Sequence, residues 1–254
     1  MGKTYFASDF HLGVPGRLSS AERERQIVRW LRQIQGDADA IYLVGDVFDF
    51  WFDYKAVVPK GFVRLMGTLA EIRDAGIPIY FFTGNHDLWM FRYFEEELDI
   101  PVYREPIVRT IQGKVFYIGH GDGLGPGDHG YKLLKKVFSN PICQWFYARV
   151  HPNLGVGLAN YFSRRSRYAN PVEMEFLGPE KEWLVQFANE QLDHIQVDYF
   201  VFGHRHLPIN YQLKNGRSRY INLGEWLHSN SYAVFDGQTV QLAFFEQPKG
   251  RVFP

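Results

Sequence analysis

One sequence feature restricts the fold of this chain most. Short apolar segments are followed directly by turns rich in glycine, aspartate and histidine. The first three are Lys3–Ala7, Ala40–Val44 and Pro78–Thr83. Helix signals separate them: Ser19 or Ser20 can cap a helix that runs to about Ile34, and a second helix is expected around residues 62–75. Alternation of strand and helix predicts parallel strands joined by right-handed crossovers. The first half therefore predicts an α/β fold.

The pattern changes in the second half of the chain. Three antiparallel hairpins are expected at the turns Gln112-Gly113, Asn215-Gly216 and Asp236-Gly237. Residues 129–170 indicate helical pieces broken by prolines and a glycine. A longer helix is expected from about Pro179 to Ile195, before the strand Tyr199–Gly203. We predict a mixed α/β core with an antiparallel second half and a helical insertion at about 129–170.

Composition excludes several classes of protein. The 254 residues include 28 basic and 28 acidic side chains, so the chain is neither a generally basic nucleic-acid binder nor an acidic tail protein. Hydrophobic residues make up 46%, which argues against disorder. Cys143 is the one cysteine, so no intrachain disulfide can form and a reducing compartment is expected. No apolar stretch is long enough to span a bilayer, and Asp9 and His11 interrupt any signal-peptide core. We expect an intracellular protein, soluble or peripheral to a membrane.

Five turns that follow strands carry ligands for hard metal ions. They are Asp9-Phe10-His11, Gly45-Asp46 with Asp49, Gly84-Asn85-His86-Asp87, Gly119-His120-Gly121-Asp122 and Gly203-His204-Arg205-His206. The carboxyl ends of strands meet at one edge of an α/β sheet, where such folds place their sites. The ligand types are carboxylate, amide and imidazole without thiolate, which suits Mn²⁺, Fe or Zn²⁺ in an oxygen-rich site. Each turn alone could be an ordinary surface or core feature, but five of the nine histidines fall in this set.

The order of these motifs, DxH, GDxxD, GNHD, GHxD and GHxH, resembles the calcineurin-like metallophosphoesterase superfamily over most of the chain. The resemblance implies a β-sandwich of mixed sheets flanked by helices, and two divalent metal ions, most often Mn²⁺, with Fe or Zn as alternatives. It assigns two ligand sets: Asp9, His11, Asp46 and His206 for one metal, and Asp46, Asn85, His120 and His204 for the other. Asp46 would bridge the two ions.

Such a pair of ions, about 3.5–4 Å apart, can clamp a phosphoryl group and activate water. The resemblance gives catalytic roles to Asp46, as the bridge, and to His86, as an electrostatic aid or proton donor to the leaving group. Asp87 would orient a neighbouring ligand. Asp49 and Asp122 remain open, because acids at these positions can equally cap turns.

The expected insertion has an unusual composition. Between Asp128 and Glu173 there are seven basic residues and no acidic one, so the rest of this neutral chain carries a net charge of −7. The same interval is rich in large apolar residues. A basic, apolar, helical segment suits an anionic amphiphile or an anionic membrane surface. The alternative is ordinary packing of an apolar stripe beneath a solvated charged face.

Four further segments resemble the UDP-2,3-diacylglucosamine pyrophosphohydrolases: GDVFDFWF, HGDGLGPGDHGY, RRSRYAN and NLGEW. That family cleaves its substrate to UMP and 2,3-diacylglucosamine 1-phosphate (lipid X) in lipid A biosynthesis. The resemblance implies one domain over residues 1–254, an insertion that covers the acyl chains, and a place on the cytoplasmic face of the inner membrane. It assigns the substrate contacts to Asn85, His86, Asp128, Ser166, Asn170 and His204.

The chain departs from this family at two positions and leaves other functions open. His86 stands where the best-known branch has arginine, and Glu173 stands where a lysine is expected. A soluble phosphodiesterase or nucleotide phosphatase would use the same metals. A metal-poor binding scaffold would show damaged ligands, and every ligand position here is intact. A nuclease would need a broad basic face, whereas the uncompensated basic residues lie in one apolar segment, so no nucleic-acid partner is expected.

Overall fold

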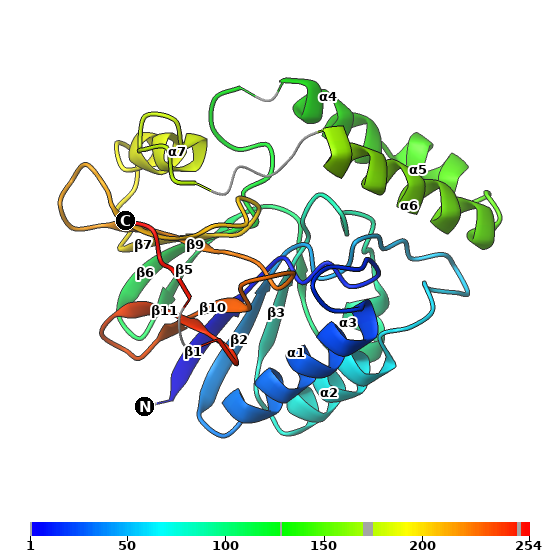
Figure 1. Ribbon diagram of the computed structural model, residues 1–254, viewed down its shortest axis with the longest axis horizontal. Coiled ribbons are helices and arrows are strands. Elements are labelled where there is room, and N and C mark those ends of the chain that lie inside the picture. The colour runs from blue at the N-terminus through cyan, green and yellow to red at the C-terminus, as the bar shows by residue number, and fades with distance from the viewer. Residues whose placement is uncertain (1, 128, 170–174, 248–249) are drawn as a thin grey trace.

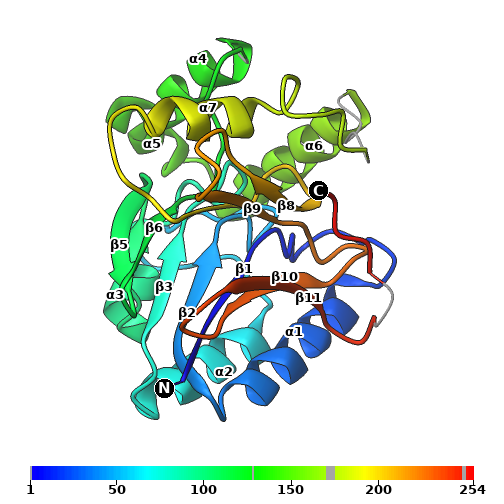
Figure 2. The ribbon, with the colours of Figure 1, turned by 90° about the vertical axis from the view of Figure 1, so that its left-hand side faces the viewer.

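Two β-sheets pack face to face, and helices cover their outer faces (Figures 1 and 2). The computed structural model describes residues 2–127, 129–169, 175–247 and 250–254. The first sheet has the strand order β11-β10-β1-β2-β3-β4. Its strands are β1 (Lys3–Ala7), β2 (Ala38–Val44), β3 (Ile79–Phe82), β4 (Val102–Tyr103), β10 (Ser231–Phe235) and β11 (Val240–Phe244).

The second sheet has the order β5-β6-β7-β9-β8. Its strands are β5 (Ile107–Ile111), β6 (Lys114–Ile118), β7 (Tyr199–Phe202), β8 (Pro208–Gln212) and β9 (Arg219–Leu223). Helices α1 (Ser20–Ile34), α2 (Val63–Asp74) and α3 (Tyr93–Leu98) cover the first sheet, and α7 (Trp183–Gln191) covers the second. The segment α4–α6 lies above the sandwich in Figure 1 and is called the insertion; it comprises α4 (His129–Phe138), α5 (Pro141–Tyr147) and α6 (Pro152–Ala169).

Three buried clusters hold these layers together, one at each interface. The first joins the helices α1–α3 to the first sheet and centres on Trp30, Trp51 and Trp226. The second lies between the sheets, where Phe6 stacks on Phe116 with ring centroids 5.6 Å apart. The third joins the second sheet to α7. The fold is the mixed α/β sandwich flanked by helices that the sequence predicts.

Several local predictions are confirmed. Strands β1, β2 and β3 pair in parallel, as the strand–helix alternation predicts. Ser19 caps α1 in a capping box with Glu22. The three expected turns join β5 to β6, β8 to β9 and β10 to β11, and all three pairs are antiparallel.

Two predictions are wrong in part, and two short elements were not predicted. The second half is not antiparallel throughout, since β7 pairs in parallel with both β6 and β9. The long connection through the insertion and α7 is a crossover, which parallel strands require. The helix expected from about Pro179 to Ile195 extends only from Trp183 to Gln191, because Glu182 has an extended backbone and its carboxylate pairs with Arg205. The short elements α3 and β4 were not predicted.

The insertion exposes its apolar residues instead of forming a core. No residue of α4 or α5 is buried. Ten of the fifteen exposed large hydrophobic residues in the described part of the chain lie here: Leu133, Leu134, Val137, Ile142, Trp145, Phe146, Leu154, Leu158, Tyr161 and Phe162. Among the described residues, no helix has both the length and the apolar character needed to cross a membrane.

Candidate metal centre

The five ligand-bearing turns meet at the carboxyl ends of the strands, beneath the insertion (Figure 1). Backbone hydrogen bonds join neighbouring turns. Asp9 donates its N–H to the Gly45 carbonyl at 3.0 Å, and His11 donates to the Asp46 carbonyl at 2.9 Å. In the second sheet, Gly203 donates to the His120 carbonyl at 2.9 Å. The site is therefore formed by the facing ends of both sheets.

The backbone is strained at this edge. Among the described residues, ten other than glycine have a positive φ, and five of them are candidate metal ligands: Asp9, His11, Asp46, His204 and His206. Such left-handed conformations cost free energy and persist where the surrounding structure enforces them, commonly at functional sites. The strain here turns carboxylates and imidazoles toward a common centre.

Glycine at position 45 permits a very close approach between the two sheets. Gly45 has a φ of 85°, and a Cβ atom added there would lie 2.4 Å from Nδ1 of His120. Any side chain at this position would push His120 away from Asp46. The glycine before the aspartate is thus a steric requirement of the site.

The first group of ligand atoms comprises Asp9, His11, Asp46 and His206. The Nε2 atoms of His11 and His206 lie 3.1 Å apart. Nε2 of His206 is 3.0 Å from Oδ1 of Asp9, and Nε2 of His11 is 3.9 Å from Oδ2 of Asp46. Two imidazoles and two carboxylates thus converge within the span of one coordination sphere.

The second group comprises Asp46, His120 and His204. Nε2 of His120 lies 3.3 Å from Oδ2 of Asp46. Nδ1 of His120 lies 2.9 Å from the Val44 carbonyl, and a carbonyl only accepts, so Nδ1 carries the hydrogen. This tautomer leaves the Nε2 lone pair pointing at the group, as a metal ligand requires. Asp46 belongs to both groups.

Asn85 lies beside Asp46 because both of its neighbours touch that carboxylate. His86 donates its backbone N–H to Oδ1 of Asp46 at 2.8 Å, and Gly84 lies against the same side chain. Oδ1 of Asn85 is buried and accepts no hydrogen bond from any described residue. Its amide oxygen is thus available to a cation at the second group.

The residue types at the site suit divalent cations, and so do the buried atoms that they place there. Oδ1 of Asp9 and Nε2 of His120 are also buried. The polar atoms beside them belong to other candidate ligands: Nε2 of His206 lies 3.0 Å from the first, and Oδ2 of Asp46 lies 3.3 Å from the second. Buried polar atoms are normally satisfied, so the atoms point to a ligand at this centre.

The charges at the centre also favour cations. Burial opposes ionisation of Asp9 and Asp46, yet the neighbouring imidazoles hold the pKa of both carboxyls below the ordinary value. Conversely, burial disfavours the charged imidazoles, but the carboxylates around His11 and His120 raise the pKa of each to about 10. In the chain without ions, a second proton on the rings of His11 and His120 supplies positive charge beside the carboxylates, whereas His204 stays neutral.

Asp49, which the sequence left open, lies inside the site. Its Oδ1 is 3.5 Å from Nδ1 of His11 and 3.5 Å from Nδ1 of His86, and the side chain is buried. Ser163 of α6 donates to Oδ2 of Asp49 at 3.0 Å. Asp49 therefore connects His11, His86 and the insertion, a contact across 114 positions of sequence that no local pattern reports.

Asp87 holds two of the turns together. Its carboxylate accepts backbone N–H groups from Gly84 at 2.7 Å and Val47 at 2.9 Å. Burial and the nearby Asp46 charge raise the pKa of Asp87 to about 7. These contacts are those expected of a residue that orients its neighbours, which is the role that the sequence analysis gives Asp87.

Arg23 of α1 is a site residue that sequence reasoning missed. Its buried guanidinium donates to the carbonyls of Phe10 at 2.8 Å, His11 at 2.6 Å and Val14 at 2.6 Å. It thus fixes the turn that presents Asp9 and His11. Helical periodicity could not identify it, because a buried arginine looks like a surface residue in a sequence.

The expected substrate contacts are only partly described. Asp128 and Asn170 lie outside the described residues, as does the side chain of Ser166. His86 is at the site, with its Nδ1 atom 3.0 Å from the Asp49 carbonyl. The backbone N–H of His204 donates to Oδ2 of Asp9 at 3.1 Å, and burial together with His120 lowers the pKa of the His204 ring to about 4.

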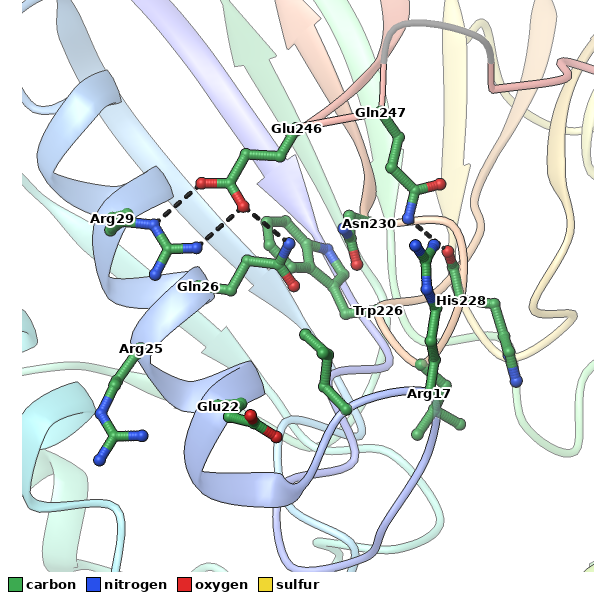
Figure 3. A pocket seen from close by; sticks show the side chains of 12 residues that line it. Arg17, Glu22, Arg25, Gln26, Arg29, Trp226, His228, Asn230, Glu246 and Gln247 are labelled. Atoms are coloured by element: carbon green, nitrogen blue, oxygen red, sulfur yellow. Dashed lines mark hydrogen bonds and ion pairs between the residues drawn. The ribbon is translucent and has the colours of Figure 1, made fainter.

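A separate pocket of about 390 Å³ lies between α1 and the loop after β9 (Figure 3). None of its lining residues belongs to the metal-ligand groups. Glu246 crosses it, and accepts hydrogen bonds from Arg29 at 2.8 Å and from Gln26 at 3.0 Å (Figure 3). These contacts tie the segment after β11 to α1.

Comparison with known proteins agrees with this geometry. The calcineurin-like phosphoesterase family matches residues 2–208, which include all five turns. The chain belongs to this family. The match shows that it is a metallophosphoesterase with the sandwich fold described above, and a hydrolase that uses divalent metal ions.

Two curated relatives carry the same name, UDP-2,3-diacylglucosamine hydrolase. The protein from Porphyromonas gingivalis is 39% identical over 257 residues, with 96% of this chain and 98% of that protein covered. The protein from Serratia proteamaculans is 27% identical over 244 residues, with 95% and 98% covered. Among solved structures, the Escherichia coli phosphoesterase Yfce aligns with a TM-score of 0.49 and 16% identity, covering 97% of this chain and 95% of that one.

Proposed function

We propose that this phosphoesterase hydrolyses the pyrophosphate of UDP-2,3-diacylglucosamine, releasing UMP and 2,3-diacylglucosamine 1-phosphate. One observation carries the proposal: Asp46 is shared by two groups of metal-ligand residues, and an apolar, basic insertion lies directly above them. The relatives named for this substrate match the chain almost end to end, which supports the choice of substrate.

Seven residues would hold the metal ions. Asp9, His11, Asp46 and His206 would form one set, and Asp46, His120 and His204 the other. Asn85, whose buried Oδ1 accepts no hydrogen bond from a described residue, would join the second set, and Asp46 would be the bridge. Carboxylate, amide and imidazole ligands suit Mn²⁺, with Fe or Zn as alternatives. When bound, two such ions lower the pKa of water and neutralise charge on the phosphoryl oxygens.

The chain's own residues orient and charge the site. The Asp49 carbonyl accepts from Nδ1 of His86, which leaves Nε2 of that ring to face the substrate. With hydrogens on both ring nitrogens, His86 would donate a hydrogen bond or a proton from Nε2 to the phosphate that leaves. Arg23 and Asp87 would keep the ligand turns in place.

The insertion would bind the lipid part of the substrate. Its apolar side chains are exposed, among them Leu133 at 66%, Ile142 at 66% and Phe146 at 63%. Exposed apolar groups of this extent mark interaction surfaces. The interval holds basic and no acidic residues, which suits acyl chains that end in an anionic head group. Asn85, His86 and His204 would contact the head group, together with Asp128, Ser166 and Asn170.

The same surface favours a location on a membrane. We propose that the chain is a single domain with α4–α6 as a helical lid, and that the insertion contacts the anionic cytoplasmic face of the inner membrane. Apolar burial and attraction to anionic lipid act together in such contacts, and salt screens the second.

A product assay tests the proposal directly. The Mn²⁺-loaded protein is incubated with UDP-2,3-diacylglucosamine, and UMP and the lipid monophosphate are measured by mass spectrometry. We expect both products in equal amounts. Hydrolysis of bis(4-nitrophenyl) phosphate without lipid turnover would instead favour a soluble phosphodiesterase or nucleotide phosphatase of the same family.

A further inference from the structure

Helix α4 and the chain that follows the insertion are each tied to a residue that flanks candidate metal ligands. Asp122 follows His120 by two positions and is buried. From α4, Tyr131 donates its hydroxyl to Oδ2 of Asp122 at 2.6 Å, and Nζ of Lys135 lies 2.7 Å from the same oxygen. A change in the position of α4 would therefore pull on the turn that carries His120.

The chain that follows the insertion is tied by a buried ion pair. Arg205 lies between His204 and His206, and its Nε donates to the two carboxylate oxygens of Glu182 at 3.2 and 3.1 Å. Its Nη2 donates to Oε1 of Glu182 at 3.0 Å and to the Glu175 carbonyl at 2.8 Å. The two side chains are only 4% and 3% exposed. The chain that returns from the insertion is thus fixed by the residue between two ligands.

The turn that carries Arg205 is sensitive to displacement. His204 and His206 have φ values of 65° and 57°, and each belongs to a different ligand group. A strained turn keeps its shape only where the surroundings enforce it. Arg205 is the one residue of the turn between the two ligands, and its partners Glu182 and Glu175 both lie on the returning chain.

Aromatic packing holds the middle of the insertion. Tyr147 of α5 packs on Phe52 and Trp89, with ring centroids 4.8 and 4.5 Å apart. No residue of α4 or α5 is buried, so this packing is partial, and directed polar contacts add to it. Trp89, whose indole donates to the Phe138 carbonyl at 2.8 Å, and Ser163 add contacts in between.

We infer that Glu182 and Lys135 are positioning residues that act through Arg205 and Asp122. They couple the placement of α4 and of the chain before α7 to the metal ligands His120, His204 and His206. The inference rests on the proposed two-metal centre, but not on the identity of the substrate. Neither residue contacts the ligand groups directly. Substituting them should therefore weaken metal binding and turnover without removing a ligand.

The first test is Glu182→Gln. The metal-free protein is titrated with Mn²⁺, and binding is monitored by electron paramagnetic resonance. We expect the dissociation constant of at least one ion to rise by about tenfold or more, which is typical when a residue that orients metal ligands is replaced. With bis(4-nitrophenyl) phosphate, which is too small to need the insertion, we expect a reduced kcat and an almost unchanged KM. Arg205→Gln and the double variant complete a cycle, in which the double variant should be no worse than either single one.

Controls separate this effect from general damage. Asp193→Asn breaks an exposed ion pair with Lys214 beyond the other end of α7 and should change neither Mn²⁺ binding nor kcat. Glu182→Gln leaves a buried arginine without its partner and could unfold the chain. Lys135→Met therefore serves as the second variant, because Lys135 is only partly buried and Tyr131 still binds Asp122.

The inference would be overturned if Glu182→Gln and Lys135→Met both fold, and if both bind Mn²⁺ and hydrolyse the diester within twofold of the unmodified chain. Weakened Mn²⁺ binding in either variant, with Asp193→Asn unchanged, would support it. Failure to cleave UDP-2,3-diacylglucosamine would refute the substrate and leave this result standing, since neither measurement uses the lipid.

Discussion

The metal-ligand edge and the insertion are neighbours, yet they place side chains in opposite ways. At the edge, charged groups are buried: Asp9 is 0% exposed, and Asp46 and His11 are 1% exposed. In the insertion, apolar groups are exposed, with Leu133 at 66% and Phe162 at 61%. Both arrangements are costly for an isolated chain. We propose that each becomes favourable when a ligand completes it, a cation at the edge and a lipid on the insertion.

The largest effect is expected from removing the shared carboxylate at the edge. Asp46→Ala deletes a side chain that belongs to both ligand groups. A metal pair contributes several kcal/mol to phosphoryl transfer, so turnover should fall by about a thousandfold or more. Mass spectrometric metal analysis should find fewer than two ions per chain. Asp74→Ala, at an exposed position of α2, is the matched control. Two ions with near-normal turnover would refute the bridging role.

A matched pair of tryptophans tests whether the insertion is stabilised by packing as the sandwich is. Trp30 of α1 is fully buried, whereas Trp145 of α5 is 52% exposed. Trp30→Ala should lower the free energy of unfolding by about 3–5 kcal/mol, because it opens a large cavity. Trp145→Ala should change it by about 0.5 kcal/mol or less. Urea unfolding followed by circular dichroism measures both. Similar losses in the two variants would mean that Trp145 belongs to a core.

The sandwich could largely be predicted from the sequence because local signals determine most of it. Ser19 marks the start of α1, and glycine turns define three hairpins. Helix α3 escaped prediction because its six residues are too few for a helical period and Arg92 provides no side-chain cap. The parallel pairing of β7 was missed because it depends on a crossover that encloses the insertion. Pairing between distant strands has no local signature.

For the candidate site too, the sequence predicts the residues with local signals and misses those that only the fold brings in. The ligand types were readable because each turn follows a strand, and in four of the five turns a glycine directly precedes the first ligand. The contacts that support the ligands could not be predicted from the sequence. Arg23 and Ser163 reach the site from helices, and Glu182 reaches it from the chain before α7. Their chemistry is ordinary in sequence, and only the fold brings them to the ligands.

A smaller loss is expected at His86, which faces the site without belonging to the two main ligand groups. His86→Ala should lower kcat by about 10- to 100-fold, within the range of a general acid or a hydrogen-bond donor to phosphate. Both ions should remain, because Asp46 and its partners are untouched. Kinetics and metal analysis on the same preparation check this, with the exposed His194→Ala as control. An emptied site would instead make His86 a ligand.

The smallest effect should come from the insertion and should depend on the substrate. Ile142, Trp145 and Phe146 lie together on α5 and are 66%, 52% and 63% exposed. Replacing all three by serine removes apolar area that an acyl chain or a membrane would cover, at about 25 cal/mol per Å². We expect kcat/KM for UDP-2,3-diacylglucosamine to fall by about tenfold, which corresponds to roughly 1.4 kcal/mol. Hydrolysis of bis(4-nitrophenyl) phosphate by this variant should not change. As a control, Val108→Ser, at an exposed apolar position of β5, should leave the hydrolysis of both substrates unchanged. An equal loss on both substrates would mean that α5 supports the metal centre itself, and the contrast between a lipid-binding insertion and a metal-binding edge would no longer hold.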